Sequence, residues 1–318
     1  MAHPIKSENP GAELLPNEIP DAEFEPLDGE ETDSEFAAIK SRTHLRDAWS
    51  RFKKNRLALV SLVFLAVMVL LAVFVPILSS YTYDEMDAAQ VNSLPSASHL
   101  LGTDKFGRDI FVRLMSGARI SLSVGFAAAI MNLVIGIVYG GICGYIGGKT
   151  DMILMRVVDI IYSVPTLLYV ILIMLVFGPN MFSVLLAIGV SSWGGMARLV
   201  RGQILSLKEQ EYAQAAFVIG ASKARILFKH LIVNCLGPII VETTLSVPTA
   251  IFTEAFLAFV GIGISLPQAS WGTMANEARS LMQTQPLQML WPVLAISLTI
   301  LILNFIGDGL NEAFDPKA

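Results

Sequence analysis

The sequence has little charge. Asp, Glu, Lys and Arg together make up 15% of its 318 residues, whereas a typical soluble domain carries about 25%. Apolar residues account for 54%, and they gather in long runs. These proportions exclude an ordinary soluble globular protein and indicate an all-α integral membrane protein.

Cysteine and histidine are scarce as well. Cys143 and Cys235 lie in apolar surroundings and nothing in their spacing pairs them, so we expect small packed side chains. The four histidines lie outside the apolar runs, and neither a G-x-S-x-G nor an H-E-x-x-H pattern occurs. The sequence therefore argues against an intramembrane hydrolase and predicts no metal site.

A nucleotide site is also missing. Residues 147–150, GGKT, resemble the end of a P-loop, but the pattern G-x-x-x-x-G-K-[ST] requires a glycine where this chain has Cys143. The four residues also close an apolar run, whereas a P-loop joins a strand to a helix. We expect that the chain binds neither ATP nor another cofactor.

The N-terminal region carries most of the negative charge. Residues 1–40 hold eleven acidic residues against Lys6 and Lys40, and they show no apolar period. Such a segment cannot bury enough apolar surface to offset its chain entropy. We predict a disordered acidic tail over 1–44, and the lack of a basic and then apolar stretch argues against a signal peptide.

Six apolar stretches are long enough to cross a bilayer, which requires about 20 helical residues. They predict six transmembrane helices, preceded by the tail and divided into a first helix with an extracellular segment (45–118) and a core (119–318). The predicted spans are 57–78, 120–147, 153–177, 181–200, 236–264 and 287–309.

Lysine and arginine predict the orientation, because they are enriched in cytoplasmic loops. Placing both termini in the cytoplasm puts 17 of them inside and five outside. Four of the five outside cluster in 105–119, which allows that segment to lie along the membrane surface. The outside residues are Lys105, Arg108, Arg113, Arg119 and Arg279.

A stripe of glycines marks the second span. Gly136, Gly140, Gly144 and Gly148 recur every four residues, so they share one helix face and allow another helix to pack closely. Pro165 in the third span and Pro248 in the fifth are each expected to bend their helix.

Four acidic residues fall within the spans: Asp159, Glu242, Glu254 and Asp308. Charged groups are costly in lipid and normally face a cavity or a partner. Asp159 and Asp308 lie near the cytoplasmic ends, where interfacial pairing explains them. Glu254 is deeper, and it is the first candidate for facing a transport pathway, with Asp159 second.

The cytoplasmic segment 203–234 predicts a helix, a glycine turn and a second helix. Tyr212, Ala215, Ala216 and Ile219 fall on one helix face, Gly220 suits the helix end, and Ser222 is a cap for the next helix. Spacing alone leaves two alternatives: a helix pair on the lipid surface, or a helix presented to a groove of a soluble partner.

The same segment resembles the EAA loop of ABC-importer permeases. Ala215, Ala216 and Gly220 stand at the family's spacing, while Gln214 replaces its glutamate and Val233 its proline. The resemblance implies contacts with the ATPase subunits by seven residues: Glu211, Gln214, Ala215, Ala216, Gly220, Ala221 and Ser222.

Further stretches, in order over about 44–318, resemble the C-type permease subunit of oligopeptide, dipeptide and nickel importers. They are LRDAWSRFKKNRLAL, HLLGTDKFGRDIFVRLMSGARISLSVG, MRVVDIIYSVPTLL, TEAFLAFVGIGISLPQASWG and GDGLNEAFDP. The resemblance implies a type I ABC importer permease fold in a prokaryotic cytoplasmic membrane, and a chain that is not itself an enzyme.

That family membership would also imply partners. They are a second, similar permease subunit, two ATPase subunits that bind ATP and Mg²⁺, an extracellular solute-binding protein and membrane lipid, with no nucleic acid. A peptide is the first choice of substrate, and nickel or another small solute is the second. An autonomous channel or secondary transporter remains the alternative of another class.

Overall fold

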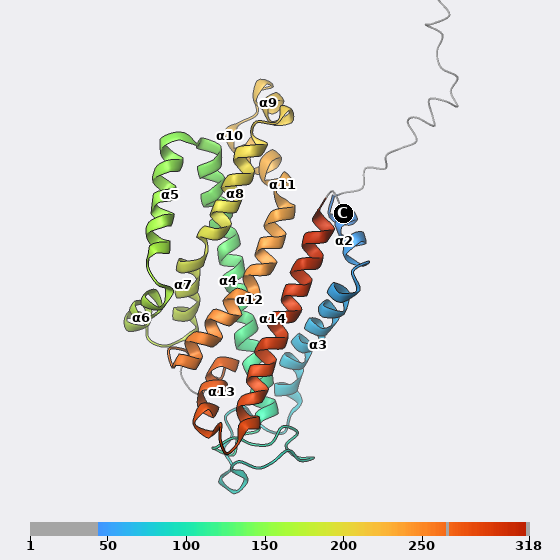
Figure 1. Cartoon of the computed structure of the whole chain (residues 1–318), viewed down its shortest axis with the longest axis vertical. Coiled ribbons are helices and arrows are strands. Elements are labelled where there is room, and N and C mark those ends of the chain that lie inside the picture. The colour runs from blue at the N-terminus through green and yellow to red at the C-terminus, as the bar shows by residue number, and fades with distance from the viewer. Residues whose placement is uncertain (1–43, 265–266, 316–318) are drawn as a thin grey trace, which may run out of the picture. The chain divides into compact units, whose positions relative to one another are not determined.

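The computed structural model describes residues 44–264 and 267–315, and the chain divides into two compact units, Met1–Arg46 and Asp47–Ala318. The predicted tail lies outside the described residues except for His44. Within the described ranges the structure is helical, and its only β feature is an isolated bridge between Thr103 and Asp109. The larger unit contains the bundle of long helices (Figure 1).

The first span follows a short amphipathic helix, α2 (His44–Phe52). Helix α3 (Arg56–Leu78) starts at Asn55, whose side chain accepts a hydrogen bond from the backbone N–H of Ala58. Most side chains of α3 are apolar and exposed, which suits a helix with much of its surface in lipid. A short helical turn, η2 (Ala88–Gln90), lies in the segment that follows.

The second span is longer than predicted. Helix α4 (Ile110–Ile146) begins where an oxygen of Asp109 accepts from the N–H of Val112, and it ends at Gly147, whose φ is +68°. Residues 110–119, which the sequence allowed to lie along the membrane surface, therefore form the first turns of α4. The boundary that we predicted between 118 and 119 falls inside this helix.

The third span is broken. Helices α5 (Gly148–Ser163) and α6 (Thr166–Phe177) meet at an angle of 83° around Pro165. Proline lacks the N–H that would continue the helix and disfavours helical geometry in the residue before it. The bend at Pro165 is confirmed, whereas Pro248 lies inside the unbroken helix α12 (Leu236–Val260).

The remaining helices complete the bundle. Within residues 44–264 and 267–315, five helical segments are long and apolar enough to cross a membrane, one of them being Met181–Leu207, which joins α7 and α8. The number is six when the bent pair α5–α6 is taken as one span. The other elements are α7 (Met181–Ser192), α8 (Gly194–Leu207), α9 (Glu211–Val218), α10 (Lys223–Arg225), the π-helix η3 (Ile226–Leu231), α11 (Ile232–Asn234), α13 (Trp271–Ala278), η4 (Arg279–Leu281) and α14 (Pro286–Phe314).

Helix α4 is central, and its glycines let α8 pack against it. A Cβ added at Gly144 would lie 2.8 Å from the carbonyl oxygen of Arg201, and one added at Gly136 or Gly140 would lie closer still to Met196 or Ala197 of α8. The packing role predicted for these three glycines is confirmed. Gly148 is the exception, because it starts α5 with a φ of +57° and no atom stands within 4 Å of an added Cβ.

The two ends of the bundle differ. Helices α9–α11, the turn between α4 and α5, and the end of α14 lie at one end (Figure 1). Helix α13 and the segment between α3 and α4 lie at the other. Segments far apart in the sequence thus build each end.

Candidate functional site

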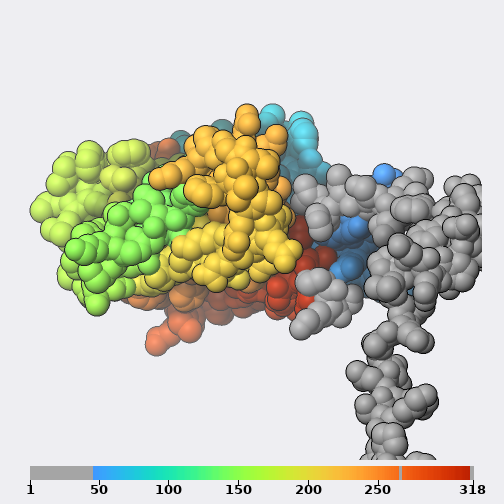
Figure 2. All heavy atoms as spheres, turned by 90° about the horizontal axis from the view of Figure 1, so that it is seen from above, coloured from blue at the N-terminus to red at the C-terminus, as the bar shows by residue number. Residues whose placement is uncertain are grey.

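Helix α9 and the chain after it extend beyond the neighbouring helices (Figure 1), and α10, η3 and α11 lead back into α12. Figure 2 looks onto this end, where the yellow and orange atoms of the segment are uncovered. One interrupted helical path therefore connects an exposed end of the molecule to a membrane-spanning helix.

The turn after α9 has the geometry that the sequence predicts. Gly220 has a φ of +83°, its N–H donates to the carbonyl of Phe217, and the N–H of Ala221 donates to the carbonyl of Ala216. These two bonds make a Schellman motif, which usually requires glycine at the left-handed position. The Ser222 hydroxyl then accepts from the N–H of Arg225 and caps the next helix.

The buried face of α9 differs from the predicted one. Ala213 and Ala216 are buried and pack in a cluster with Ile226 and Leu227 of η3. Ala215 is exposed, so the predicted apolar face was wrong by about a quarter of a turn. Ala216 therefore joins α9 to this chain's own second helix and is not available to a partner's groove.

The outward side of α9 carries an apolar tip. Phe217, Val218 and Ile219 are 65%, 82% and 82% exposed. Glu211 and Gln214 are exposed on the same helix, and the Gln214 side chain donates to the backbone carbonyl of Glu209 at 3.0 Å. We call Phe217–Ile219 the apolar tip.

A second feature, a polar groove of about 440 Å³, is lined by residues of α5–α6, α7–α8 and α12, together with Asn132 of α4. Helix α12 contributes Glu242, Ser246, Thr249 and Thr253 to it. We predicted no role for this row from the sequence, although its four polar residues recur at helical spacing within an apolar run, which indicates a polar helix face.

The wall opposite α12 is held by hydrogen bonds around Tyr162. The Tyr162 hydroxyl donates to the carbonyl of Ser192 and accepts from the N–H of Gly195, both at 2.9 Å. Ser192 in turn donates to Asn132 Oδ1 at 2.9 Å. These bonds fix α5, the α7–α8 junction and α4 relative to one another.

The two predicted pathway residues lie outside the lining of this groove. Glu254 is 1% exposed, and one of its carboxylate oxygens accepts from the Ser121 hydroxyl of α4 at 3.0 Å. It lies inside the packed bundle and not on a surface that a second subunit can share. Asp159 is half exposed and pairs with Arg198 at 3.0 Å and Arg156 at 3.6 Å, which matches the interfacial pairing considered for it.

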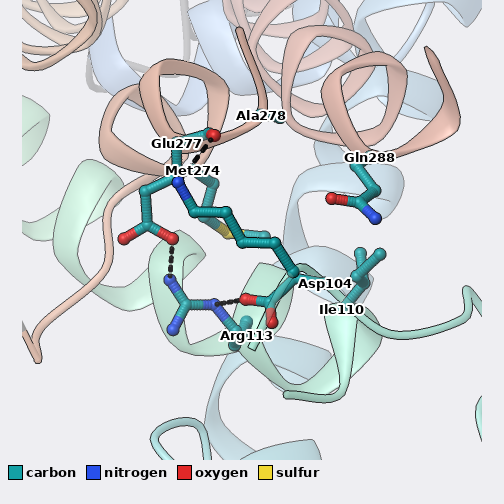
Figure 3. A pocket seen from close by; sticks show the side chains of 8 residues that line it. Asp104, Ile110, Arg113, Met274, Glu277, Ala278 and Gln288 are labelled. Carbon is teal, nitrogen blue, oxygen red and sulfur yellow. Dashed lines mark hydrogen bonds and ion pairs between the residues drawn. The ribbon is translucent and has the colours of Figure 1, made fainter. Parts of the chain in front are cut away.

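At the opposite end, an ion-pair cluster joins the segment before α4 to α13 (Figure 3). Arg113, 1% exposed, lies between Glu277 at 3.1 Å and Asp104 at 3.6 Å. Arg108, 2% exposed, contacts Glu277 at 2.5 Å and Asp104 at 2.6 Å. Two buried positive charges are thus matched by two negative ones.

This cluster explains the excess of arginine on the predicted outer side. Arg108 and Arg113 are neutralised inside the protein, so they contribute little to the charge bias that sets the orientation. Asp104 and Arg108 belong to the GTDKFGRD stretch that carries the family resemblance. These two residues of the stretch therefore have a structural role in the ion-pair cluster.

Comparisons with known proteins agree with these features. Residues 136–318 match the family described as binding-protein-dependent transport system inner membrane component. Residues 43–95 match the N-terminal transmembrane domain of oligopeptide transport permease C. The chain belongs to this permease family.

Relatives match over nearly the whole length. The oligopeptide transport system permease protein OppC of Bacillus subtilis is 45% identical over 94% of this chain and 98% of its own. The dipeptide transport system permease protein DppC of the same organism is 44% identical over 95% and 94%. OppC of Escherichia coli K12 is 42% identical over 89% and 95%.

A solved structure shares the fold. The match is to an inward-facing conformation of the MetNI methionine ABC transporter, with a TM-score of 0.53 and 17% identity, covering 65% of this chain and 96% of that one. The chain therefore has the type I ABC importer permease fold that the resemblance implies.

Proposed function

We propose that this chain, as a member of that permease family, is one of two membrane-spanning subunits of an ATP-driven peptide importer. A second, similar permease completes the pathway, two ATPase subunits bind ATP and Mg²⁺, and an extracellular binding protein delivers the peptide. The chain itself is not an enzyme. The relatives named above carry oligopeptide or dipeptide in their names, which favours a peptide over nickel or another small solute.

The apolar tip is the observation that carries this proposal. Three consecutive large apolar side chains are exposed at the end of α9, which extends beyond the neighbouring helices (Figure 1), and such patches mark contacts with a partner. The Schellman turn holds the tip in a defined conformation, which favours docking into a groove of a soluble partner. We place this end in the cytoplasm, because Lys208, Lys223, Arg225 and Lys229 are near it.

The contacts inside the chain supply a route from the ATPase to the pathway. Ala213 and Ala216 fasten α9 to η3, so a push on the tip moves both helices together. The helix then continues through Cys235, whose N–H bonds to the carbonyl of Leu231 and whose carbonyl accepts from Ile239, into α12. Helix α12 lines the groove, so movement at the tip changes the groove walls.

Alternating access follows from this linkage. ATPase closure pushes on the tip and switches the helices between inward-open and outward-open packings, and the two packings are discrete because packed interfaces deform in steps. The free energy comes from ATP binding and hydrolysis on the partner subunits.

Substitutions at Gly220 test the coupling. Nothing lies within 4 Å of a Cβ added at Gly220, so any effect reflects backbone conformation and not a clash. Gly220→Val should lose peptide-stimulated ATP hydrolysis, since a β-branched residue disfavours a φ of +83°. Gly220→Asn is the matched control, because asparagine tolerates the left-handed region, and it should retain most of the stimulation.

The measurement is ATPase activity of the purified complex in nanodiscs, with and without binding protein and tri-alanine. Ile219→Asp should abolish stimulation and Ile219→Leu should keep it, because only aspartate places a charge in the apolar contact. Full stimulation in both Gly220→Val and Ile219→Asp would contradict the assignment of this segment to coupling. Unaided tri-alanine flux into vesicles holding this chain alone would instead favour an autonomous transporter.

A further inference from the structure

The polar groove contains an acidic side chain that is left without a partner. Glu242 is partly buried in a membrane-spanning helix, and no residue of 44–264 or 267–315 forms an ion pair or hydrogen bond with its carboxylate. It is also the one charged residue that lines the groove. A carboxylate in a membrane-spanning helix normally faces a cavity or a partner. Glu242, six residues after the start of α12, faces the groove and is open to a cationic group of a ligand.

The groove surroundings offer acceptors. Four lining hydroxyl groups each donate to a backbone carbonyl three or four residues earlier in their own helix, which uses their single proton and leaves oxygen lone pairs for a ligand. They belong to Ser191, Ser246, Thr249 and Thr253. The groove therefore suits a ligand rich in N–H groups.

Gly195 leaves room for such a group beside Glu242. A Cβ added there would lie 3.8 Å from Oε1 of Glu242 and 3.9 Å from the Tyr162 hydroxyl oxygen. Because residue 195 has no side chain, a small cation can enter between these two oxygen atoms. The Tyr162 proton is already bonded to Ser192, so its oxygen can only accept.

The length of the groove fits an extended peptide. Glu242 and Thr253 are eleven positions apart on α12, which corresponds to about 16 Å at a rise of about 1.5 Å per residue. An extended chain of about four or five residues spans that distance at about 3.3–3.6 Å per residue.

We propose that Glu242 binds the N-terminal ammonium group of the peptide in transit, while the hydroxyl oxygens along α12 accept from the peptide's backbone N–H groups. This rests on the proposed function and names the group that this subunit recognises in its substrate. The cytoplasmic side of the pathway, near the start of α12, would receive the peptide's amino end. Recognition of an ammonium and of backbone groups is independent of peptide side chains.

The test uses the full complex in proteoliposomes, with ATP inside and binding protein and radiolabelled tri-alanine outside. Glu242→Gln keeps the shape and removes the charge, and it should lower the initial uptake rate about tenfold. Glu242→Asp keeps the charge and should stay within about threefold of the wild type. Asp308→Asn is the matched control, since Asp308 is an exposed carboxylate outside the groove lining, and it should leave uptake unchanged.

Two further readouts separate recognition from a structural role. Peptide-stimulated ATP hydrolysis should persist in Glu242→Gln, because the tip and its linkage are intact. Alanyl-glutamyl-alanine should lose uptake by the same factor as tri-alanine, because both carry the same ammonium group.

Each contrary result has a distinct meaning. Wild-type uptake in Glu242→Gln would overturn this inference and leave the peptide importer standing. Loss of stimulated ATP hydrolysis together with uptake, or a loss confined to one of the two peptides, would also overturn it. Failure of the wild-type complex to import either peptide would overturn the proposed function and this inference with it.

Discussion

The contact between α4 and α8 makes a sharp prediction, because two adjacent glycines of α4 have different surroundings. A Cβ added at Gly140 would lie 3.0 Å from the backbone carbonyl carbon and Cα of Ala197, and closer still to its carbonyl oxygen. A Cβ at Gly141 would lie 3.6 Å from the nearest atom, Cδ1 of Leu227. Only the first change forces backbone against backbone.

The size of the effect follows from these distances. The optimal separation of two nonbonded carbon atoms is about 3.5–4.0 Å, so Gly140→Ala must move α4 and α8 apart by about 0.5–1 Å. Overpacking of this kind typically costs about 1–3 kcal/mol. Gly141→Ala meets ordinary contacts and should be neutral or stabilising by up to about 1 kcal/mol, since alanine favours the helix.

The assay is thermal unfolding of the purified complex, followed by size-exclusion chromatography of a fluorescently tagged chain. One kcal/mol shifts the midpoint of a domain of this size by about 2–4 °C. We expect Gly140→Ala to unfold several degrees below Gly141→Ala. Equal midpoints, or the reverse order, would refute the close approach of the two helices. Because α8 belongs to the same chain, the loss should be in the fold of this subunit and not only in its assembly with others.

Four other outcomes are expected. Glu277→Gln should destabilise the complex by about 3 kcal/mol, because it leaves two buried guanidinium groups sharing Asp104, and an unchanged thermal midpoint would contradict this. Ser222→Ala should cost about 1 kcal/mol of helix stability because the N-cap hydrogen bond is lost. The loss should be measurable as faster amide hydrogen exchange in the residues after Gly220, whereas Ser222→Asp, which can still cap the helix, should exchange like the wild type. Burial raises the pKa of Cys235 to about 11, so the thiol is protonated at pH 7.5. Maleimide should therefore label Cys235 only after unfolding, and labelling of Cys235 in the intact complex would disprove its burial. Deleting residues 2–40, which hold no apolar period, should leave assembly and peptide uptake near normal, and lost uptake at normal abundance would give the tail a role.

Local features could be predicted from the sequence. The membrane spans depend on the length of apolar runs, the bend at Pro165 on a missing N–H, and the turn at Gly220 on a φ that side chains disfavour. The cap at Ser222 likewise involves a residue only three positions away. Each of these features depends on residues that are neighbours in the chain, so the residue pattern and the chemistry of single side chains were sufficient to predict it.

The side of a helix that faces its neighbours could not be predicted from the sequence. The sequence shows that Glu242 and Glu254 are on α12, but not which of them points into the groove and which packs against Ser121 of α4. In the same way, the buried side of α9 turned out to contain Ala213, because η3 covers that side.

By itself the sequence determined the class of protein, the approximate spans, the glycine stripe at Gly136–Gly144 and the helix–glycine–helix segment, because apolar length and turn chemistry act locally. Only the tertiary structure decided that Arg108 and Arg113 are neutralised by Glu277, and that α12 supplies one wall of a polar groove. Those contacts join residues from about 50 to more than 160 positions apart, and their geometry exists only once the helices pack.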